Sequence, residues 1–163
     1  MNKLVLALFF SLPASGQETI VFKPAENLTV SNVSAIKLYA YDINKGCDRA
    51  TPVSLIDNDK VTPCSRYVKT FEKEKVKQII KLLRSEATYG GEPAACFETN
   101  YSLMMLDKAN VVIGYVDISL FCNRLIANPL IPETGKKNGF SKKGKELLLH
   151  TLELVSEEDI VAP

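Results

Sequence analysis

The sequence lacks several residue types and motifs on which common functions depend. It has no tryptophan, one histidine (His150) and four cysteines in 163 residues. No Cys-x-x-Cys pair occurs, and a single histidine cannot make a Cys/His cluster with zinc-ligand spacing. Because phosphate-binding glycine loops and dinucleotide fingerprints are also missing, we expect neither a metal nor a cofactor.

An excess of charge of either sign is also missing. The chain has 20 Lys and Arg against 19 Asp and Glu, a formal net charge of +1. Nucleic acids and anionic membranes usually select a clearly basic face, so we expect neither as a partner. Hydrophobic residues at 46% and charged residues at 24% are typical of a globular chain, and the length fits one domain.

The first sixteen residues have the pattern of a secretory signal. Lys3 precedes the apolar run Leu4–Leu12, and Ala14-Ser15-Gly16 supplies small residues for cleavage. The run is shorter than the about 20 residues that span a bilayer. We expect cleavage after Gly16 and a mature domain of residues 17–163 without a transmembrane segment, secreted or periplasmic. A short N-terminal core strand is the alternative.

Export changes the interpretation of the four cysteines, because disulfides persist in oxidising compartments. Four cysteines allow three pairings, and short loops cost less entropy to close. This favours Cys47–Cys64 and Cys96–Cys122. Free buried thiols, or a redox or catalytic thiol, remain the alternatives.

Hydrophobic periodicity predicts an α+β fold, with an antiparallel sheet of about four or five strands and two helices packed on one face. Thr70 is the expected cap of the first helix, with a buried stripe of Val76, Ile79, Ile80 and Leu83. Ser141 is the expected cap of the second helix, whose stripe includes Leu147, Leu148 and Leu152. We expect strands at 19–22, 35–43, 53–56, 101–106 and 111–121, helices at 70–86 and 141–155, a loop at 126–139 and a frayed acidic tail at 156–163.

Strand alternation divides the side chains between two faces of the sheet. Val112, Val116 and Ile118 are expected on the core face. The opposite face is expected to carry Asp117, Ser119, Tyr39, Tyr41 and Tyr115. Those tyrosines either form an exposed recognition surface or lie under a loop or helix.

Candidates for catalysis are few. His150 is expected on the surface of the last helix, away from its apolar stripe. Among the carboxylates, Asp42 and Asp117 are the better candidates for catalysis. Such a pair would suit glycoside hydrolysis only at a certain separation of the two carboxyl groups, which the sequence does not give. A position on a solvated sheet face explains both residues without catalysis. The sequence therefore favours a protein that is not an enzyme.

Lysines crowd the start of the last helix, where its dipole disfavours cations. A bound anion would relieve that conflict, whereas extension into water is the simpler explanation. The candidate anion-binding residues are Lys136, Lys137, Lys142, Lys143 and Lys145.

The second half of the chain, over about residues 96–155, resembles uncharacterised exported proteins and lipoproteins of Bacteroidetes-type bacteria. The resemblance rests on Cys96-Phe97, on Ile118-Ser119-Leu120-Phe121-Cys122-Asn123 and on Gly139-Phe140-Ser141-Lys142-Lys143-Gly144. Thr99 and Ser119 replace a proline and a cysteine of the family pattern. The resemblance implies export and a strand–strand–helix order but no activity.

Together these features predict a non-catalytic exported domain that binds a protein, a peptide or a cell-envelope component through the sheet face or the lysine-rich loop. A small extracytoplasmic enzyme, either a thiol-redox protein or a hydrolase, is the alternative.

Overall fold

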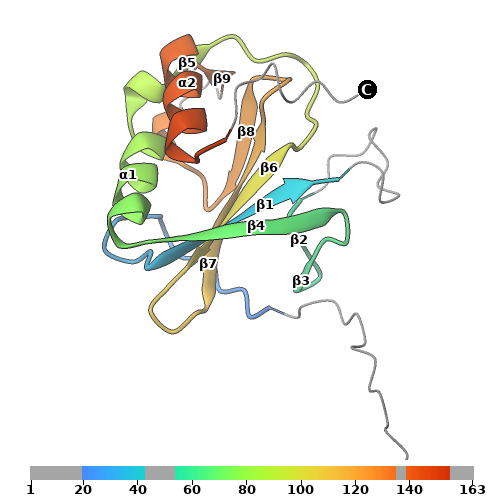
Figure 1. Cartoon of the computed structure of the whole chain (residues 1–163), viewed down its shortest axis with the longest axis vertical. Coiled ribbons are helices and arrows are strands. Elements are labelled where there is room, and N and C mark those ends of the chain that lie inside the picture. Colours follow the sequence, from blue (N-terminus) through green and yellow to red (C-terminus); the bar gives the residue numbers. More distant parts are fainter. Residues whose placement is uncertain (1–19, 43–53, 135–138, 155–163) are drawn as a thin grey trace, which may run out of the picture.

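A computed structural model describes residues 20–42, 54–134 and 139–154, which form an α+β domain (Figure 1). Its centre is a five-stranded antiparallel sheet in the order β4-β1-β6-β7-β8. The expected sheet with two helices on one face is confirmed. Residues 1–19, which contain the predicted signal segment, and the predicted tail at 156–163 lie outside the described residues. The strands are β1 (Ala35–Tyr41), β4 (Ser65–Glu72), β6 (Tyr101–Leu106), β7 (Val112–Ser119) and β8 (Arg124–Asn128).

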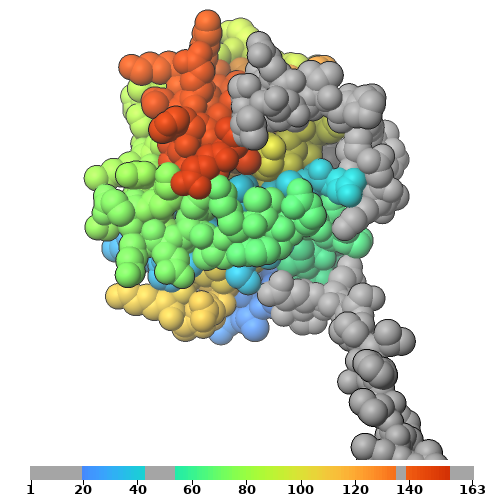
Figure 2. Space-filling model, in the orientation of Figure 1, coloured from blue at the N-terminus to red at the C-terminus, as the bar shows by residue number. Residues whose placement is uncertain are grey.

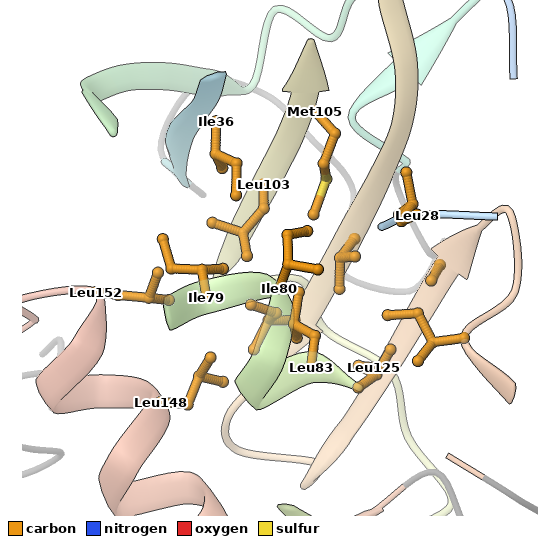
Figure 3. Packing of buried hydrophobic residues seen from close by; sticks show 14 of the residues in the cluster. Leu28, Ile36, Ile79, Ile80, Leu83, Leu103, Met105, Leu125, Leu148 and Leu152 are labelled. Carbon is orange, nitrogen blue, oxygen red and sulfur yellow. The ribbon is translucent and has the colours of Figure 1, made fainter. Parts of the chain in front are cut away.

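The helices α1 (Lys73–Leu83) and α2 (Lys142–Thr151) cover one face of this sheet (Figure 1). The four expected residues of α1 are the ones buried, and Leu148 and Leu152 of α2 pack into the same cluster. Figure 3 shows Ile79, Ile80 and Leu83 between the sheet residues and α2. Leu147 was expected in this stripe but is 44% exposed, because only one side of α2 faces α1 and the sheet. No helix in the described ranges is long and apolar enough to cross a membrane.

The expected start of α1 at Thr70 is wrong. Thr70 belongs to β4 and pairs with Lys37 of β1, and the ladder continues to Glu72. Glu72 precedes the helix without a side-chain capping bond. Antiparallel pairing with β1 therefore sets this boundary.

The outer surface of β4 and α1 is continuous, with α2 above it (Figure 2). Glu153, just after α2, joins the three elements through ion pairs to Lys69 of β4 and Lys75 of α1 at 2.7 and 3.1 Å.

The cap of α2 is confirmed. Ser141 Oγ accepts a hydrogen bond from Gly144 N at 3.0 Å. Gly144 is buried against Thr88, which belongs to a 3₁₀ turn (Glu86–Thr88) that follows α1. A Cβ atom added to Gly144 would meet the backbone carbonyl of Thr88, so the glycine is required for close approach.

We predict that Gly144→Ala lowers the free energy of unfolding by about 1–3 kcal/mol, as overpacking does. Helix propensity alone predicts a gain of about 1 kcal/mol, so the two effects differ in sign. Lys143→Ala, one residue earlier and exposed, is the control and should stay within about 0.5 kcal/mol of wild type. Urea unfolding measures both, and a stabilised Gly144→Ala variant would contradict the packing argument.

The second face of the sheet is covered, not solvated. Residues 20–25 form backbone hydrogen bonds with β7: Lys23 N donates to Val112 O at 2.8 Å, and Ala25 N donates to Ile113 O at 2.9 Å. A hairpin formed by β2 (Ile56–Asp57) and β3 (Lys60–Val61) packs beside this segment. The expected strand at 19–22 appears as one parallel bridge, Phe22 to Val112. The second core consists of Ile20, Tyr39, Leu55, Val61, Met104, Leu106 and Val112.

Two further expectations need correction. Val112 was expected on the same face as Val116 and Ile118 but lies in this second core. The pairing of β6 with β7 is irregular between Met105 and Leu106 and leaves Ile113 unpaired, so the alternation of side chains between the two faces is reversed at the start of β7. The expected loop at 126–139 begins within β8, and its last residue already belongs to β9 (Gly139–Phe140), which pairs with β5 (Tyr89–Gly91). These strands are too short for their alternation to stand out among the neighbouring prolines and glycines.

The predicted disulfide between Cys96 and Cys122 is confirmed, with a Cα–Cα distance of 5.6 Å. It joins the loop before β6 to the turn after β7, and so ties together the open end of the β6–β7 hairpin. Cys64 is buried and disulfide-bonded. Cys47, its predicted partner, lies outside the described residues.

Candidate functional site

The predicted site residues do not gather at one place. His150 is exposed on α2, as expected. Asp42 directly follows β1, and its backbone N–H donates to the Cys64 carbonyl at 2.8 Å. β6 separates β1 from β7, and Asp117 is aligned through Ser102 with Tyr39, three residues before Asp42, so the backbones of the two aspartates are further apart than two strand spacings, about 10 Å.

The lysine group is only partly described. Lys142 and Lys143 are exposed in the first turn of α2, and Lys145 Nζ donates to the Leu120 carbonyl at 2.7 Å. Lys136 and Lys137 lie outside the described residues. Lys145 thus contacts a partial negative charge at the turn after β7, and the anion hypothesis stays a prediction.

Asp117 is the main departure from the expected solvated face. Its side chain is only 2% exposed in the middle of β7. Ser102 Oγ of β6 donates to one carboxylate oxygen, and Ser54 Oγ donates to the other at 3.2 Å. A further hydrogen bond comes from the backbone of Leu55, which is itself fully buried. The carboxyl group therefore fastens residues 54–55 to the central strands.

Burial controls the acid–base behaviour of this cluster. Loss of solvent raises the pKa of Asp117 from 3.8 to about 6, although its hydrogen bonds to Ser102, Ser54 and Leu55 act in the opposite direction. The Tyr41 hydroxyl lies 3.4 Å from Ser102 Oγ, and burial together with the charge of Asp117 raises the Tyr41 pKa. The Asp117 carboxyl group thus gains or loses its proton near pH 6 within a packed interior.

The cluster is not arranged for attack on a substrate. Ser102 has no exposed surface, and its hydroxyl is engaged with Asp117. A nucleophile must reach its substrate and have an adjacent base to activate it. Within the described residues, no group of three or more His, Cys, Asp or Glu side chains is placed to hold a metal ion. The geometry assigns the Asp117 cluster to the attachment of the covering segment.

A second region surrounds the turn Leu120–Asn123, between β7 and β8. Cys96 is exposed, whereas Cys122 is fully buried. Arg124 Nη1 donates to the Cys96 carbonyl at 3.4 Å, and Ser119 Oγ accepts from Cys122 N at 3.3 Å. In this turn the exposed Phe121 directly precedes Cys122, the buried member of the disulfide.

Large apolar side chains are exposed along the β8 border of the sheet. Phe121 in the turn before β8 is 82% exposed, Ile126 within β8 is 43% exposed, and Leu130 just after β8 is 81% exposed. They thus lie before, within and after β8, which is the last strand of the five. We call them the β8 apolar row.

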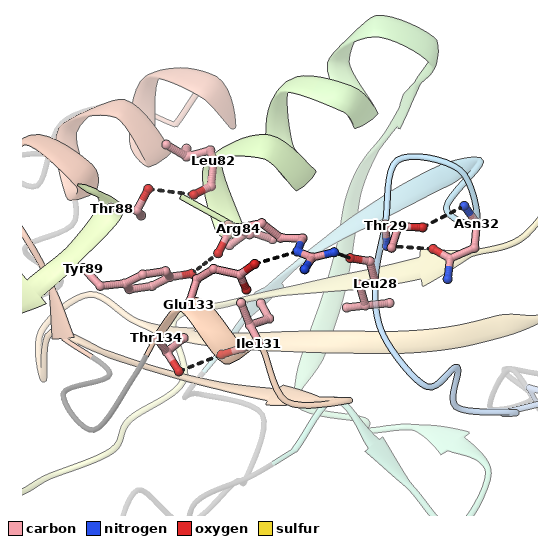
Figure 4. Close-up of polar contacts among 11 residues, drawn as sticks. Leu28, Thr29, Asn32, Leu82, Arg84, Thr88, Tyr89, Ile131, Glu133 and Thr134 are labelled. Atoms are coloured by element: carbon pink, nitrogen blue, oxygen red, sulfur yellow. Dashed lines mark hydrogen bonds and ion pairs between the residues drawn. The ribbon is translucent and has the colours of Figure 1, made fainter. Parts of the chain in front are cut away.

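Contacts of the neighbouring residues hold the segment around Leu130 in place. Ile131 is in the helix-side core, and Arg84 Nε pairs with Glu133 Oε1 at 2.9 Å (Figure 4). Arg84 Nη1 also donates to the Leu28 carbonyl at 3.4 Å, which ties the end of α1 to the N-terminal loop. The exposure of Leu130 is thus imposed by its anchored neighbours.

No protein-family model, curated protein or solved structure matches this chain. Sequence reasoning missed Phe121 and Leu130, because an apolar residue at the end of a strand pattern looks the same whether it becomes buried or exposed. Ser54 and Ser102 carried no signal of their own, since their contact with Asp117 joins positions up to 63 residues apart.

Proposed function

We propose that this protein is an exported, non-catalytic module that binds an extended, apolar polypeptide segment along the β8 apolar row. The observation that supports it is the exposure of Phe121 and Leu130, each above 80%. Large apolar side chains that are exposed together usually mark an interaction surface. The sheet face with its tyrosines is a weaker candidate, because Tyr39 is buried under the covering segment.

The shape of the row favours a polypeptide over a small molecule. Ile126 lies within β8, Leu130 lies two residues past its end, and Phe121 lies three residues before its start, so the three side chains are distributed over the length of this edge strand. Small ligands are mostly enclosed in concave pockets lined by side chains that converge on them. A linear series of separate apolar side chains instead matches alternate side chains of an extended partner.

Export is part of the proposal. The Cys96–Cys122 disulfide supports it, because such bonds are rare in reducing cytosol. The signal-like pattern of residues 1–16 and the resemblance to exported bacterial proteins are consistent with the same location.

We predict that Phe121→Ser combined with Leu130→Ser weakens peptide binding at least tenfold, with little loss of stability. The experiment selects peptides from a random, phage-displayed library on the folded protein and measures the affinity of the enriched sequences by fluorescence polarisation. Enrichment of apolar sequences, and at least a tenfold weaker affinity in the double variant, are expected, since anchor residues commonly contribute more than about 1.4 kcal/mol.

Val21→Ser combined with Leu147→Ser is the matched control, because these residues are 60% and 44% exposed on other elements. This variant should bind the selected peptides as wild type does. Absence of any enriched sequence, or equal weakening in the two double variants, would contradict the β8 apolar row as the binding surface.

A further inference from the structure

The two sulfur atoms of the Cys96–Cys122 disulfide belong to residues in opposite environments. Cys96 is exposed in the loop before β6, whereas Cys122 is fully buried in the turn after β7. Exchange begins when a thiolate reaches one sulfur of a disulfide. We propose that this disulfide is a thiol–disulfide exchange site that accepts electrons from a dithiol, with Cys96 as the attacked residue. This inference is independent of the proposed function.

Hydrogen bonds hold the Cys96 loop in place on both sides of the cysteine. Ala94 N donates to the Cys122 carbonyl at 2.9 Å, and Glu98 N donates to Ser119 Oγ at 3.3 Å. Further along, Leu120 N donates to Asn100 Oδ1 at 2.7 Å. These bonds do not involve sulfur, so they remain when the disulfide opens. The reduced protein is therefore expected to keep its fold, with the two thiols poised to pair again.

Cationic groups at the same turn favour the reduced form. Arg124 Nη1 reaches the Cys96 carbonyl, but Arg124 Nε is buried and has no hydrogen-bond partner. A buried guanidinium donor without a partner is an unusual feature, because such groups are nearly always satisfied. Lys145 Nζ also contacts this turn, where it donates to the Leu120 carbonyl. Positive charge of this kind stabilises thiolates, which makes a disulfide easier to reduce.

The proposed reaction proceeds in two balanced steps. A thiolate of the dithiol attacks Cys96 Sγ, forms a mixed disulfide with it and releases Cys122 as a thiolate. The second thiol of the dithiol, once deprotonated, attacks its own sulfur in the mixed disulfide and releases Cys96 as a thiolate. The dithiol is oxidised to a disulfide by loss of two electrons and two protons, and the Cys96–Cys122 pair takes up both electrons, while protons reach its thiolates from solvent.

The test is reduction of the folded wild-type protein by dithiothreitol. Samples are quenched with acid and alkylated, and the modified peptides are assigned by mass, while near-ultraviolet circular dichroism follows the fold. We expect Cys96 and Cys122 to become reduced at a rate proportional to dithiothreitol concentration, with the native spectrum retained. A rate independent of dithiothreitol, raised by low urea, or accompanied by loss of the spectrum would show that reduction requires unfolding and would overturn the proposal.

Single variants test the assigned roles. With Cys122→Ala, the Cys96 thiol should react with dithionitrobenzoate about 100-fold faster than the Cys122 thiol does with Cys96→Ala, because only the former is accessible. Arg124→Gln should reduce the equilibrium fraction of open disulfide about threefold to tenfold in dithiothreitol buffers. Arg124→Lys should restore most of this loss, and Lys81→Gln, an exposed charge on α1, should have no effect. Equal reactivity of the two thiols, or equal effects of Arg124→Gln and Lys81→Gln, would contradict these roles.

Discussion

Replacing Asp117 with Asn is expected to remove a large pH dependence of stability. In the wild-type protein, burial raises the pKa of this carboxyl from 3.8 to about 6. Since each pKa unit corresponds to about 1.4 kcal/mol, the difference between folded and unfolded chain amounts to about 3 kcal/mol. Asn has a similar shape but no charge at any pH, so the variant lacks this contribution.

The sign follows from where the proton binds more tightly. The folded protein holds the proton of Asp117 more strongly than the unfolded chain does, since its folded pKa is higher. The stabilisation by that proton is complete below about pH 4 and is lost as the pH rises through about 6. The unfolding free energy of Asp117→Asn, relative to that of wild type, should therefore increase by about 3 kcal/mol between pH 3.5 and pH 7.5.

Urea unfolding at a series of pH values measures this difference. Using the difference between variant and wild type cancels the titration of the other carboxylates, and it also cancels any constant cost of the amide against Ser102 and Ser54. Asp57→Asn, an exposed site on β2, is the matched control, and its difference from wild type should stay nearly constant. A flat difference for Asp117→Asn would show that Asp117 is not a buried, proton-binding carboxyl group.

Removing the Cys96–Cys122 disulfide should cost about 3–4 kcal/mol of unfolding free energy. The bridge closes a loop with a sequence separation of 26 residues, and chain-entropy arguments assign about 3.5 kcal/mol to a loop of that length. The variant is Cys96→Ala with Cys122→Ala, because a hydroxyl group at the fully buried position 122 would add a cost of its own.

The measurement is urea unfolding of the double variant, with circular dichroism to confirm that the sheet persists. Hydrogen bonds from Ala94, Glu98 and Leu120 remain on both sides of the former bridge. We therefore expect a lower urea midpoint with a native-like spectrum before the transition. Unchanged stability would mean that the unfolded chain already keeps these residues close, and a lost spectrum would mean that the hydrogen bonds alone do not hold the loop.

Local patterns in the sequence were enough for the elements that depend on near neighbours. The stripe of Val76, Ile79, Ile80 and Leu83, the cap at Ser141 and the β6–β7 hairpin are as predicted. The Cys96–Cys122 pairing follows from the same logic, since the hairpin brings its two ends together. In each case the helical or strand period, or a short loop, already determines which groups meet.

Tertiary structure decided the rest, because contacts between distant segments determine which faces are covered. Residues 20–25 and 54–61 cover the second face of the sheet, so Asp117 is buried where a solvated surface was expected, and of the two alternatives for the tyrosines the covered one holds for Tyr39. Pairing with β1 and β7 likewise sets the start of α1 and the existence of β8. The exposure of Phe121 and Leu130 belongs to the same category, because a hydrophobic side chain is buried only where another segment arrives to cover it.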